Sequence, residues 1–194
     1  MRKIAWWAAV VFAGLGLVTP MVRAADNLLV NPSFEIDKDA NGVPDGWKVE
    51  WQWASAPNRV VLDSSVHQEG SRSVRVDLLD PSVAPPWGGR MYQDVPVTPG
   101  ATYQFSGWLK LQGWQAATQK EGLGFRAWEQ YDDGSWNDVP FYLSDELFTG
   151  DFDWRQFTTT IEIPSNVKTL RIALWSNPGT GTAWWDNLEL VRIK

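Results

Sequence analysis

The side chains with the most distinctive chemistry in this sequence are its tryptophans. Fourteen occur in 194 residues, and twelve of them follow residue 24. A protein core seldom needs so many indoles, because each ring is bulky and its N–H group requires a partner. We therefore expect about half of them to pack inside and the rest to lie on a face or in loops. Exposed flat rings can stack on a flat apolar ligand, such as the C–H face of a pyranose ring.

Groups suited to covalent or metal chemistry are scarce. The sequence has no cysteine and one histidine, His67, in a polar stretch, so the usual zinc and copper sites are not expected. Glycoside hydrolysis needs two carboxylates that face each other across a cleft. The acids at 132–133 and 145–146 are adjacent pairs, and neighbours in a strand point to opposite faces. A long-range pair such as Glu121 with Asp138 is left open, but the balance is against an enzyme.

The elements that position these side chains are predicted to be strands, because no segment shows a long helical period with caps. Alternating or β-rich patterns occur at 73–79, 91–97, 102–112, 123–131, 156–163, 170–175 and 184–193. Pro99-Gly100 and the Asp-Asp-Gly-Ser stretch at 132–135 are turn signals. Several short strands punctuated by glycine and proline predict a single all-β domain, either a sandwich or a barrel.

Strand alternation also assigns the faces. In 102–112, for example, Leu109 and Leu111 share one side and Trp108 takes the other. The same reasoning predicts that one outward face, away from the core, binds the ligand through seven side chains: Arg90, Tyr92, Trp108, Arg126, Trp128, Gln130 and Trp175. Five further tryptophans in loop-like stretches could line its ends: Trp51, Trp53, Trp87, Trp114 and Trp136. The alternative is that loops cover this face, which would then be a second small core.

The first residues have the features of a removable signal peptide. Arg2 and Lys3 precede a short apolar run to about residue 18, and Val22 and Ala24 supply the small residues before the cleavage site. We therefore expect residues 1–24 to be removed, residues 25–194 to form one domain, and the product to be secreted or periplasmic. Its formal charge would fall from −6 to −9, because the lost segment carries three basic residues and no acid. So acidic a surface argues against nucleic acid and anionic membranes as partners, and we expect a monomer.

The two ends of the sequence resemble a known family. The opening segments 27–35 (NLLVNPSFE) and 42–47 (GVPDGW) resemble the start of carbohydrate-binding modules of the family 4/9/16/22 type. Further support comes from 70–76 (GSRSVRV), 92–95 (YQDV) with Pro99-Gly100, and 153–157 (DWRQF) with 184–188 (WWDNL). The resemblance runs from about Asn27 to Ile193 and implies an all-β β-sandwich of the jelly-roll type, with a sugar-binding cleft on one sheet.

The resemblance also implies a structural calcium near the chain ends. The matching positions are Glu35, in the Asn-Pro-Ser-Phe-Glu stretch, and Asp186, in Trp-Trp-Asp-Asn. Carboxylate oxygens are ligands that calcium prefers. A second pattern, at 37–45, has oxygen ligands at loop positions 1, 3, 5 and 9 and glycine at 6, as in an EF-hand. Its position 12 is Lys48, where a bidentate Glu is required, so an ordinary polar surface turn is the favoured interpretation of that segment.

Three functions remain open on the sequence alone. The favoured one is a secreted, non-catalytic module that binds a polysaccharide, of β-glucan or xylan type, through a tryptophan-lined cleft. A jelly-roll polysaccharide hydrolase or lyase, which could use Tyr131 or Tyr142 with Arg126, would release products instead. A structural protein of an envelope or matrix would use the tryptophan face for protein contacts.

Overall fold

The described part of the protein is built entirely from strands and their connections. The computed structural model describes residues 26–51, 54, 60–78, 89–116, 122–139 and 150–194. These ranges contain ten strands and no α-helix. The expected signal peptide and the tryptophans at 53 and 87 lie outside them, as does the side chain of Trp51. Within the described ranges, no helix is long and apolar enough to span a membrane.

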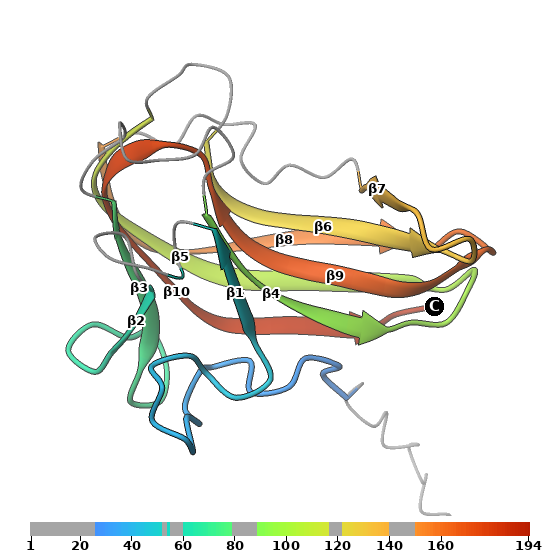
Figure 1. Cartoon of the computed structure of the whole chain (residues 1–194), viewed down its shortest axis with the longest axis horizontal. Coiled ribbons are helices and arrows are strands. Elements are labelled where there is room, and N and C mark those ends of the chain that lie inside the picture. Colours follow the sequence, from blue (N-terminus) through green and yellow to red (C-terminus); the bar gives the residue numbers. More distant parts are fainter. Residues whose placement is uncertain (1–25, 52–53, 55–59, 79–88, 117–121, 140–149) are drawn as a thin grey trace, which may run out of the picture.

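The strands form two antiparallel sheets of five. Sheet I has the order β1-β4-β9-β6-β7 and sheet II the order β2-β3-β10-β5-β8. The strands of sheet I are β1 (Lys48–Trp51), β4 (Gly89–Pro96), β9 (Val167–Ser176), β6 (Leu123–Tyr131) and β7 (Trp136–Asp138). Those of sheet II are β2 (Val60–Asp63), β3 (Ser73–Leu78), β10 (Gly179–Arg192), β5 (Thr102–Ala116) and β8 (Gly150–Glu162). Figure 1 shows two layers, with β6 and β9 in front of β5 and β8. The predicted all-β sandwich of jelly-roll type is confirmed.

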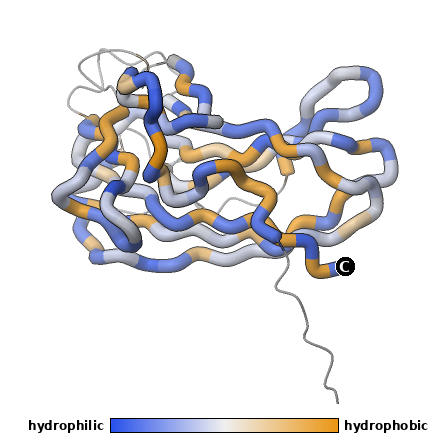
Figure 2. The backbone as a smooth tube through the Cα atoms, turned by 90° about the horizontal axis from the view of Figure 1, so that it is seen from below, coloured by the Kyte–Doolittle hydropathy of each residue, from blue (hydrophilic) through white to orange (hydrophobic). Residues whose placement is uncertain are grey.

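The core lies between the two sheets, where the apolar side of each strand is buried. In β5 the residues Phe105, Leu109 and Leu111 are buried, as the alternation predicted. Figure 2 shows hydrophobic and hydrophilic positions alternating along the tube. Gly107 allows close packing at the centre, because a Cβ there would lie 2.7 Å from the ring of Phe125. That ring meets Phe105 edge-on, with the centroids 5.3 Å apart, a favourable arrangement for aromatic pairs.

The N-terminal segment is bound to both sheets by hydrogen bonds. Asn27 donates from its side chain to the carbonyl of Leu188 and accepts from the backbone N–H of Leu190. The buried side chain of Gln93 accepts from Val30 N–H and donates to the carbonyl oxygens of Val30 and Gly46. These contacts join residues far apart in sequence without any disulfide, which suits a chain that has no cysteine.

All seven predicted strand segments are confirmed, several with extended ends, and three strands were missed. The missed strands β1, β2 and β7 contain three or four residues each, too few for an alternating pattern to be recognisable. The structure also changes two predictions on tryptophans. Trp136 lies on β7 rather than in a loop, and Trp114 is fully buried because β5 continues to Ala116. Gly179 makes room for Trp114, since a Cβ there would lie 2.4 Å from its ring.

Candidate functional site

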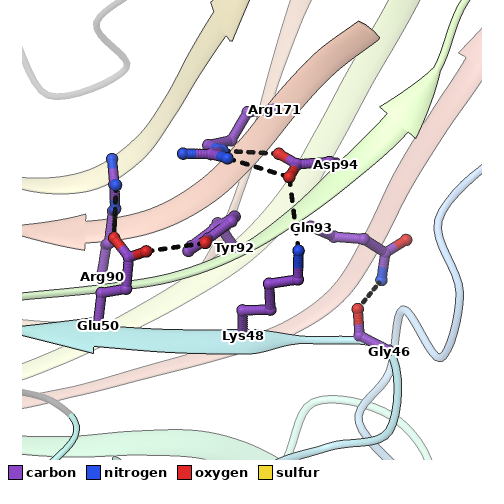
Figure 3. A network of polar contacts seen from close by, with 8 residues as sticks. All are labelled: Gly46, Lys48, Glu50, Arg90, Tyr92, Gln93, Asp94 and Arg171. Carbon is purple, nitrogen blue, oxygen red and sulfur yellow. Dashed lines mark hydrogen bonds and ion pairs between the residues drawn. The ribbon is translucent and has the colours of Figure 1, made fainter.

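The outer face of sheet I, turned away from the core, carries the candidate site. In β4 and β6 the even-numbered residues point outward, and in β9 the odd-numbered ones do, because Leu170, Ile172 and Leu174 are buried in the core. The pairing of these three strands brings Arg90 beside Trp175 and places Trp128 beside Arg171. Figure 3 shows part of this face, where side chains of β1, β4 and β9 meet.

Aromatic rings and guanidinium groups alternate across this face. We call this set the aromatic–arginine series, and its order is Trp136, Arg171, Tyr92, Arg90, Trp128, Arg126 and Trp175. The guanidinium carbon of each arginine lies between 4.0 and 5.4 Å from the centroids of its two neighbouring rings. Cation–π contacts at these distances are attractive, so the seven side chains hold one another in place.

Each arginine of the series is also paired with a carboxylate. The two carboxylate oxygens of Asp94 accept hydrogen bonds from two guanidinium nitrogens of Arg171, at 2.6 and 3.0 Å. Glu50 accepts from Arg90 Nε at 2.8 Å and from the Tyr92 hydroxyl at 2.8 Å (Figure 3). The third pair, from Arg126 to Asp138, is longer, at 3.5 Å. The positive charges of the series are therefore compensated within the protein.

These pairings change the acidity of the groups involved. Burial alone would raise the pKa of Glu50, but the hydrogen bonds from Arg90 and Tyr92 and the positive charge of Arg90 outweigh burial and hold this pKa below its ordinary value. Burial and the neighbouring Glu50 carboxylate raise the pKa of the Tyr92 hydroxyl. Tyr92 is therefore a hydrogen-bond donor at neutral pH and is poorly suited to act as a base.

The rings of the series differ in accessibility. Trp136 is 39% exposed, whereas Tyr92 and Trp175 each retain only 6%. Trp128 is half-buried, and Gln130, two residues along β6, is half-buried too. A flat ligand could therefore stack on Trp128 and Trp136, with Gln130 available for hydrogen bonds. Tyr92 and Trp175 are covered rings that support the arginines.

Six of the seven predicted ligand-binding residues lie together on this face. They are Arg90, Tyr92, Arg126, Trp128, Gln130 and Trp175. The prediction that Trp108 shares the face is wrong, because β5 belongs to sheet II. The alternation of side chains in this strand correctly predicted that Trp108 points away from the core. The sequence, however, carries no signal for which of the two sheets a strand joins. Trp108 instead lies beside Asp186 and Gln156.

Four members of the site were not predicted to take part in binding: Glu50, Asp94, Asp138 and Arg171. Trp136 was predicted to line an end of the face from a loop, and it lies on the edge strand β7 instead. A signal existed for Arg171, which shares strand parity with Trp175 in a predicted strand. None existed for Glu50 and Asp138, because β1 and β7 were not recognised as strands. Asp94 lies two residues after Tyr92 and points to the same face of β4. Its contact with Arg171 depends on the register in which β4 pairs with β9, which the sequence did not reveal.

The two residues predicted to bind calcium both lie against the segment 68–72. Glu35 accepts hydrogen bonds from the backbone N–H groups of Ser71 and Arg72. Gly70 permits this approach, because it has a φ of +66° and a Cβ there would lie 2.3 Å from the Glu35 Oε1 atom. Asp186 is fully buried and accepts from the backbone N–H groups of Gln68 and Glu69.

The electrostatics of this pair suit a cation. Burial and the nearby negative charge of Glu35 raise the pKa of Asp186, although three backbone N–H groups act against this. Hydrogen bonds from Ser71 and Arg72 outweigh burial at Glu35 and lower its pKa. Two hard-oxygen carboxylates of like charge, one fully buried, match the donor chemistry that calcium takes.

The segment 37–45 brings together three acids. The carboxylate oxygens of Asp37, Asp39 and Asp45 lie within 4.8 Å of one another. Asp37 accepts from the backbone N–H groups of Asn41 and Gly42, and Asp45 from that of Lys38. These are the side-chain-to-backbone hydrogen bonds of a polar surface turn. Such a turn is enough to account for the close approach of the three acids.

Among the described residues, those considered for catalysis lie apart from one another. His67 is exposed. A further acid, Glu129, is buried on the core side of β6, where burial raises its pKa. The hydroxyl of Tyr131 lies 3.4 Å from Glu129, rather than beside Arg126. Glu121, Tyr142 and the acids at 145–146 lie outside the described residues.

Comparisons with known proteins agree with this fold. The family model described as "Carbohydrate binding domain", of the 4/9 type, matches residues 26–181. The first family 22 xylan-binding domain of Xyn10C from Paenibacillus barcinonensis superposes with a TM-score of 0.58 at 16% identity, covering 88% of this chain and 97% of that one. No curated protein sequence matches the chain.

Two further solved structures have the same fold. A family 16 carbohydrate-binding module has a TM-score of 0.55 at 19% identity, covering 85% of this chain and 99% of that one. The C-terminal family 22 module of Clostridium thermocellum Xyn10B has a TM-score of 0.54 at 15% identity, covering 83% and 90%. At these identities the likeness establishes the fold.

Proposed function

This chain belongs to the family of carbohydrate-binding modules of the 4/9/16/22 type, and on that basis we propose that the outer face of sheet I binds a β-glucan or xylan without cleaving it. The observation that carries the proposal is the aromatic–arginine series, with Trp128 half-buried and Trp136 39% exposed. Indole faces stack on the C–H faces of pyranose rings. The guanidinium groups and Gln130 supply donors for hydroxyl groups.

Charge compensation on the face favours a neutral polysaccharide. Arg171, Arg90 and Arg126 are each paired with a carboxylate of the protein. A uronic acid on the ligand would have to compete with these carboxylates for the same donors. A neutral sugar hydroxyl needs only one N–H group, and a guanidinium has five. Xylan-binding modules among the structural relatives fit this choice, as their names describe.

The module is tested by retention on polysaccharides. Affinity gels that contain soluble xylan, mixed-linkage glucan, laminarin or a soluble cellulose derivative are run with the protein that lacks residues 1–24. The same samples are assayed for new reducing ends. We expect retardation by a glucan or xylan and no products. Absence of retardation by every polysaccharide would contradict the proposal, and release of products would favour a hydrolase or lyase.

We further propose that the pair formed by Glu35 and Asp186 binds a structural calcium ion, and that the protein is exported after removal of residues 1–24. The buried carboxylate of Asp186 and the neighbouring charge of Glu35 support a cation at this place. Calcium held at about a hundred times its Kd would add about 2.7 kcal/mol to stability. For a domain of this size a chelator should then lower Tm by about 5–10 °C, and Asp186→Asn should abolish the response to calcium.

A further inference from the structure

Trp136 is an exposed ring on a weakly supported element. Its strand, β7, is three residues long, lies at the edge of sheet I and is exposed throughout. Its only paired neighbour in the described ranges is β6. An exposed indole on such a strand has several accessible rotamers, and fixing one of them for binding lowers the affinity. A ring that must present one face to a ligand therefore needs support from elsewhere.

That support comes from Arg171, which belongs to the central strand β9. Its guanidinium carbon lies 4.3 Å from the centroid of the Trp136 ring and 4.0 Å from that of the Tyr92 ring. The Arg171 side chain is only 15% exposed. The planar guanidinium thus links an exposed ring at the edge of the sheet to a buried ring near its centre.

The orientation of the Arg171 plane is set by Asp94. The two residues are directly paired between β4 and β9, and the bidentate contact fixes two guanidinium nitrogens at once. Such fork-to-fork pairs restrain the plane of the group as well as its position. Lys48 lies 3.7 Å from the same carboxylate and adds a second positive charge (Figure 3).

We propose that Asp94 is a positioning residue, which acts through Arg171 to orient Trp136 as an outer sugar-stacking platform, so that the binding site extends from Trp128 to the edge strand β7. This inference rests on the proposed function of the face. Asp94 does not contact the sugar, and its effect on affinity is transmitted entirely through the stacked guanidinium. A longer oligosaccharide gains contacts that a shorter one cannot reach.

A double-mutant cycle tests the transmission. The affinities of Asp94→Asn, Trp136→Ala and the double variant are measured by calorimetry with xylohexaose and with a hexasaccharide of mixed-linkage β-glucan. We expect Asp94→Asn to weaken binding by about three- to tenfold in the wild-type background and by less than about twofold when Trp136 is absent, because residues that act as a unit are not additive. Equal losses in both backgrounds, or no loss in either, would overturn the proposal.

Arg171→Lys distinguishes orientation from charge. Lysine keeps the positive charge and can still pair with Asp94, but it lacks the plane that stacks on two rings. We expect it to weaken binding as Asp94→Asn does, and full affinity in this variant would contradict the stacking role. Asp132→Asn is the matched control, since it breaks the exposed pair with Lys168, 3.0 Å long and outside the series. It should leave affinity unchanged.

A spectroscopic measurement separates this inference from the proposed function. The indole N–H resonance of Trp136, assigned by its loss in Trp136→Ala, is followed in the ligand-free protein. We expect Asp94→Asn and Arg171→Lys to shift and broaden it, and Asp132→Asn to leave it in place. If the wild-type protein bound none of the glycans, the proposed function would fail, while this resonance would still decide whether Asp94 orients Trp136. An unchanged resonance in Asp94→Asn would sink the inference.

Discussion

The outer faces of the two sheets both carry tryptophan, arginine and acidic residues, yet they use them in opposite ways. On sheet II, Trp184 donates its N–H to Asp63 at 2.9 Å, and Arg75 donates to the same carboxylate oxygen at 2.9 Å. Trp184 is 5% exposed. On sheet I the guanidinium groups lie over the faces of the rings, and the carboxylates hold the guanidinium groups rather than the indoles.

The difference shows how to tell a structural tryptophan from one available to a ligand. An indole whose N–H is bound to a buried carboxylate is fixed by its edge, and its environment is closed. An indole such as Trp136, which contacts one arginine of the series through one ring face, can keep the other face for a ligand. The number of tryptophans in the sequence does not separate the two cases, whereas the way in which each ring is held does.

The largest expected effect is on stability and comes from sheet II. Asp63→Ala would leave the N–H of Trp184 and one nitrogen of Arg75 without their buried acceptor, which should cost about 3 kcal/mol. Calorimetry should show a Tm lower by about 6–12 °C, while glycan affinity stays unchanged. Asp153→Ala is the matched control, because the Asp153 carboxylate pairs with Lys110 while exposed to water, and its loss should leave Tm almost unchanged. A loss of affinity in Asp63→Ala would break the comparison.

The next effect is on affinity and comes from sheet I. Trp128→Ala removes the central accessible ring of the aromatic–arginine series and should weaken glycan binding by on the order of thirtyfold, since a buried aromatic contact contributes about 2 kcal/mol. Trp108→Ala removes an outward indole of similar exposure from sheet II and should leave the Kd unchanged in the same titration. Equal losses in the two variants would mean that the ligand contacts both faces.

Much of the fold could be predicted because it depends on local alternation. The segment 123–131 was predicted with the bounds that β6 has, and Phe125 and Ala127 point into the core as expected. Strands of three or four residues could not be recognised, because a period of two needs more positions than they contain. This is why β7, with Trp136, was interpreted as a loop.

The site was predicted in part, for a related reason. Parity within a strand decides whether a side chain points inward or outward, and this placed Trp128, Arg126 and Trp175 correctly. Parity says nothing about which sheet a strand joins, and Trp108 was misplaced for that reason. Partners such as Glu50 and Asp94 are set by the register between strands distant in sequence, which a single sequence does not encode in any local pattern.

The pH dependence of stability sharpens the comparison further. Burial would raise the pKa of Asp63, but hydrogen bonds from Ser65, Trp184 and Arg75 outweigh it and hold this pKa well below its usual value. A lowered pKa in the folded state means that the stabilisation is present above the unfolded value of 3.8 and is lost as the pH falls below it. Denaturant unfolding from about pH 5 to about pH 2 should therefore show a steeper loss in the wild type than in Asp63→Asn.

The same experiment has a smaller counterpart on sheet I. The pKa of Glu50 is also lowered, but this carboxylate is half-exposed and its stabilisation is screened by water. Glu50→Gln should therefore alter the acid limb of the stability profile less than Asp63→Asn does. If Glu50→Gln reduced the pH dependence of unfolding more than Asp63→Asn does, the buried contacts of Asp63 on sheet II would not contribute more stability than those of Glu50 on sheet I.

The smallest expected effect is that of salt on glycan affinity. Because Arg171, Arg90 and Arg126 each face a carboxylate, the face presents little uncompensated charge to a neutral sugar. The Kd for xylohexaose should change by less than about twofold between about 0.05 and 0.5 M sodium chloride, a range in which the Debye length falls below 10 Å and exposed charges are screened. Glu50→Gln exposes the charge of Arg90 and should create a salt-sensitive affinity for polygalacturonate. A tenfold weakening of xylohexaose binding by wild-type protein in salt would contradict this, because it would mean that the charge pairs of the face hold the site in its binding form.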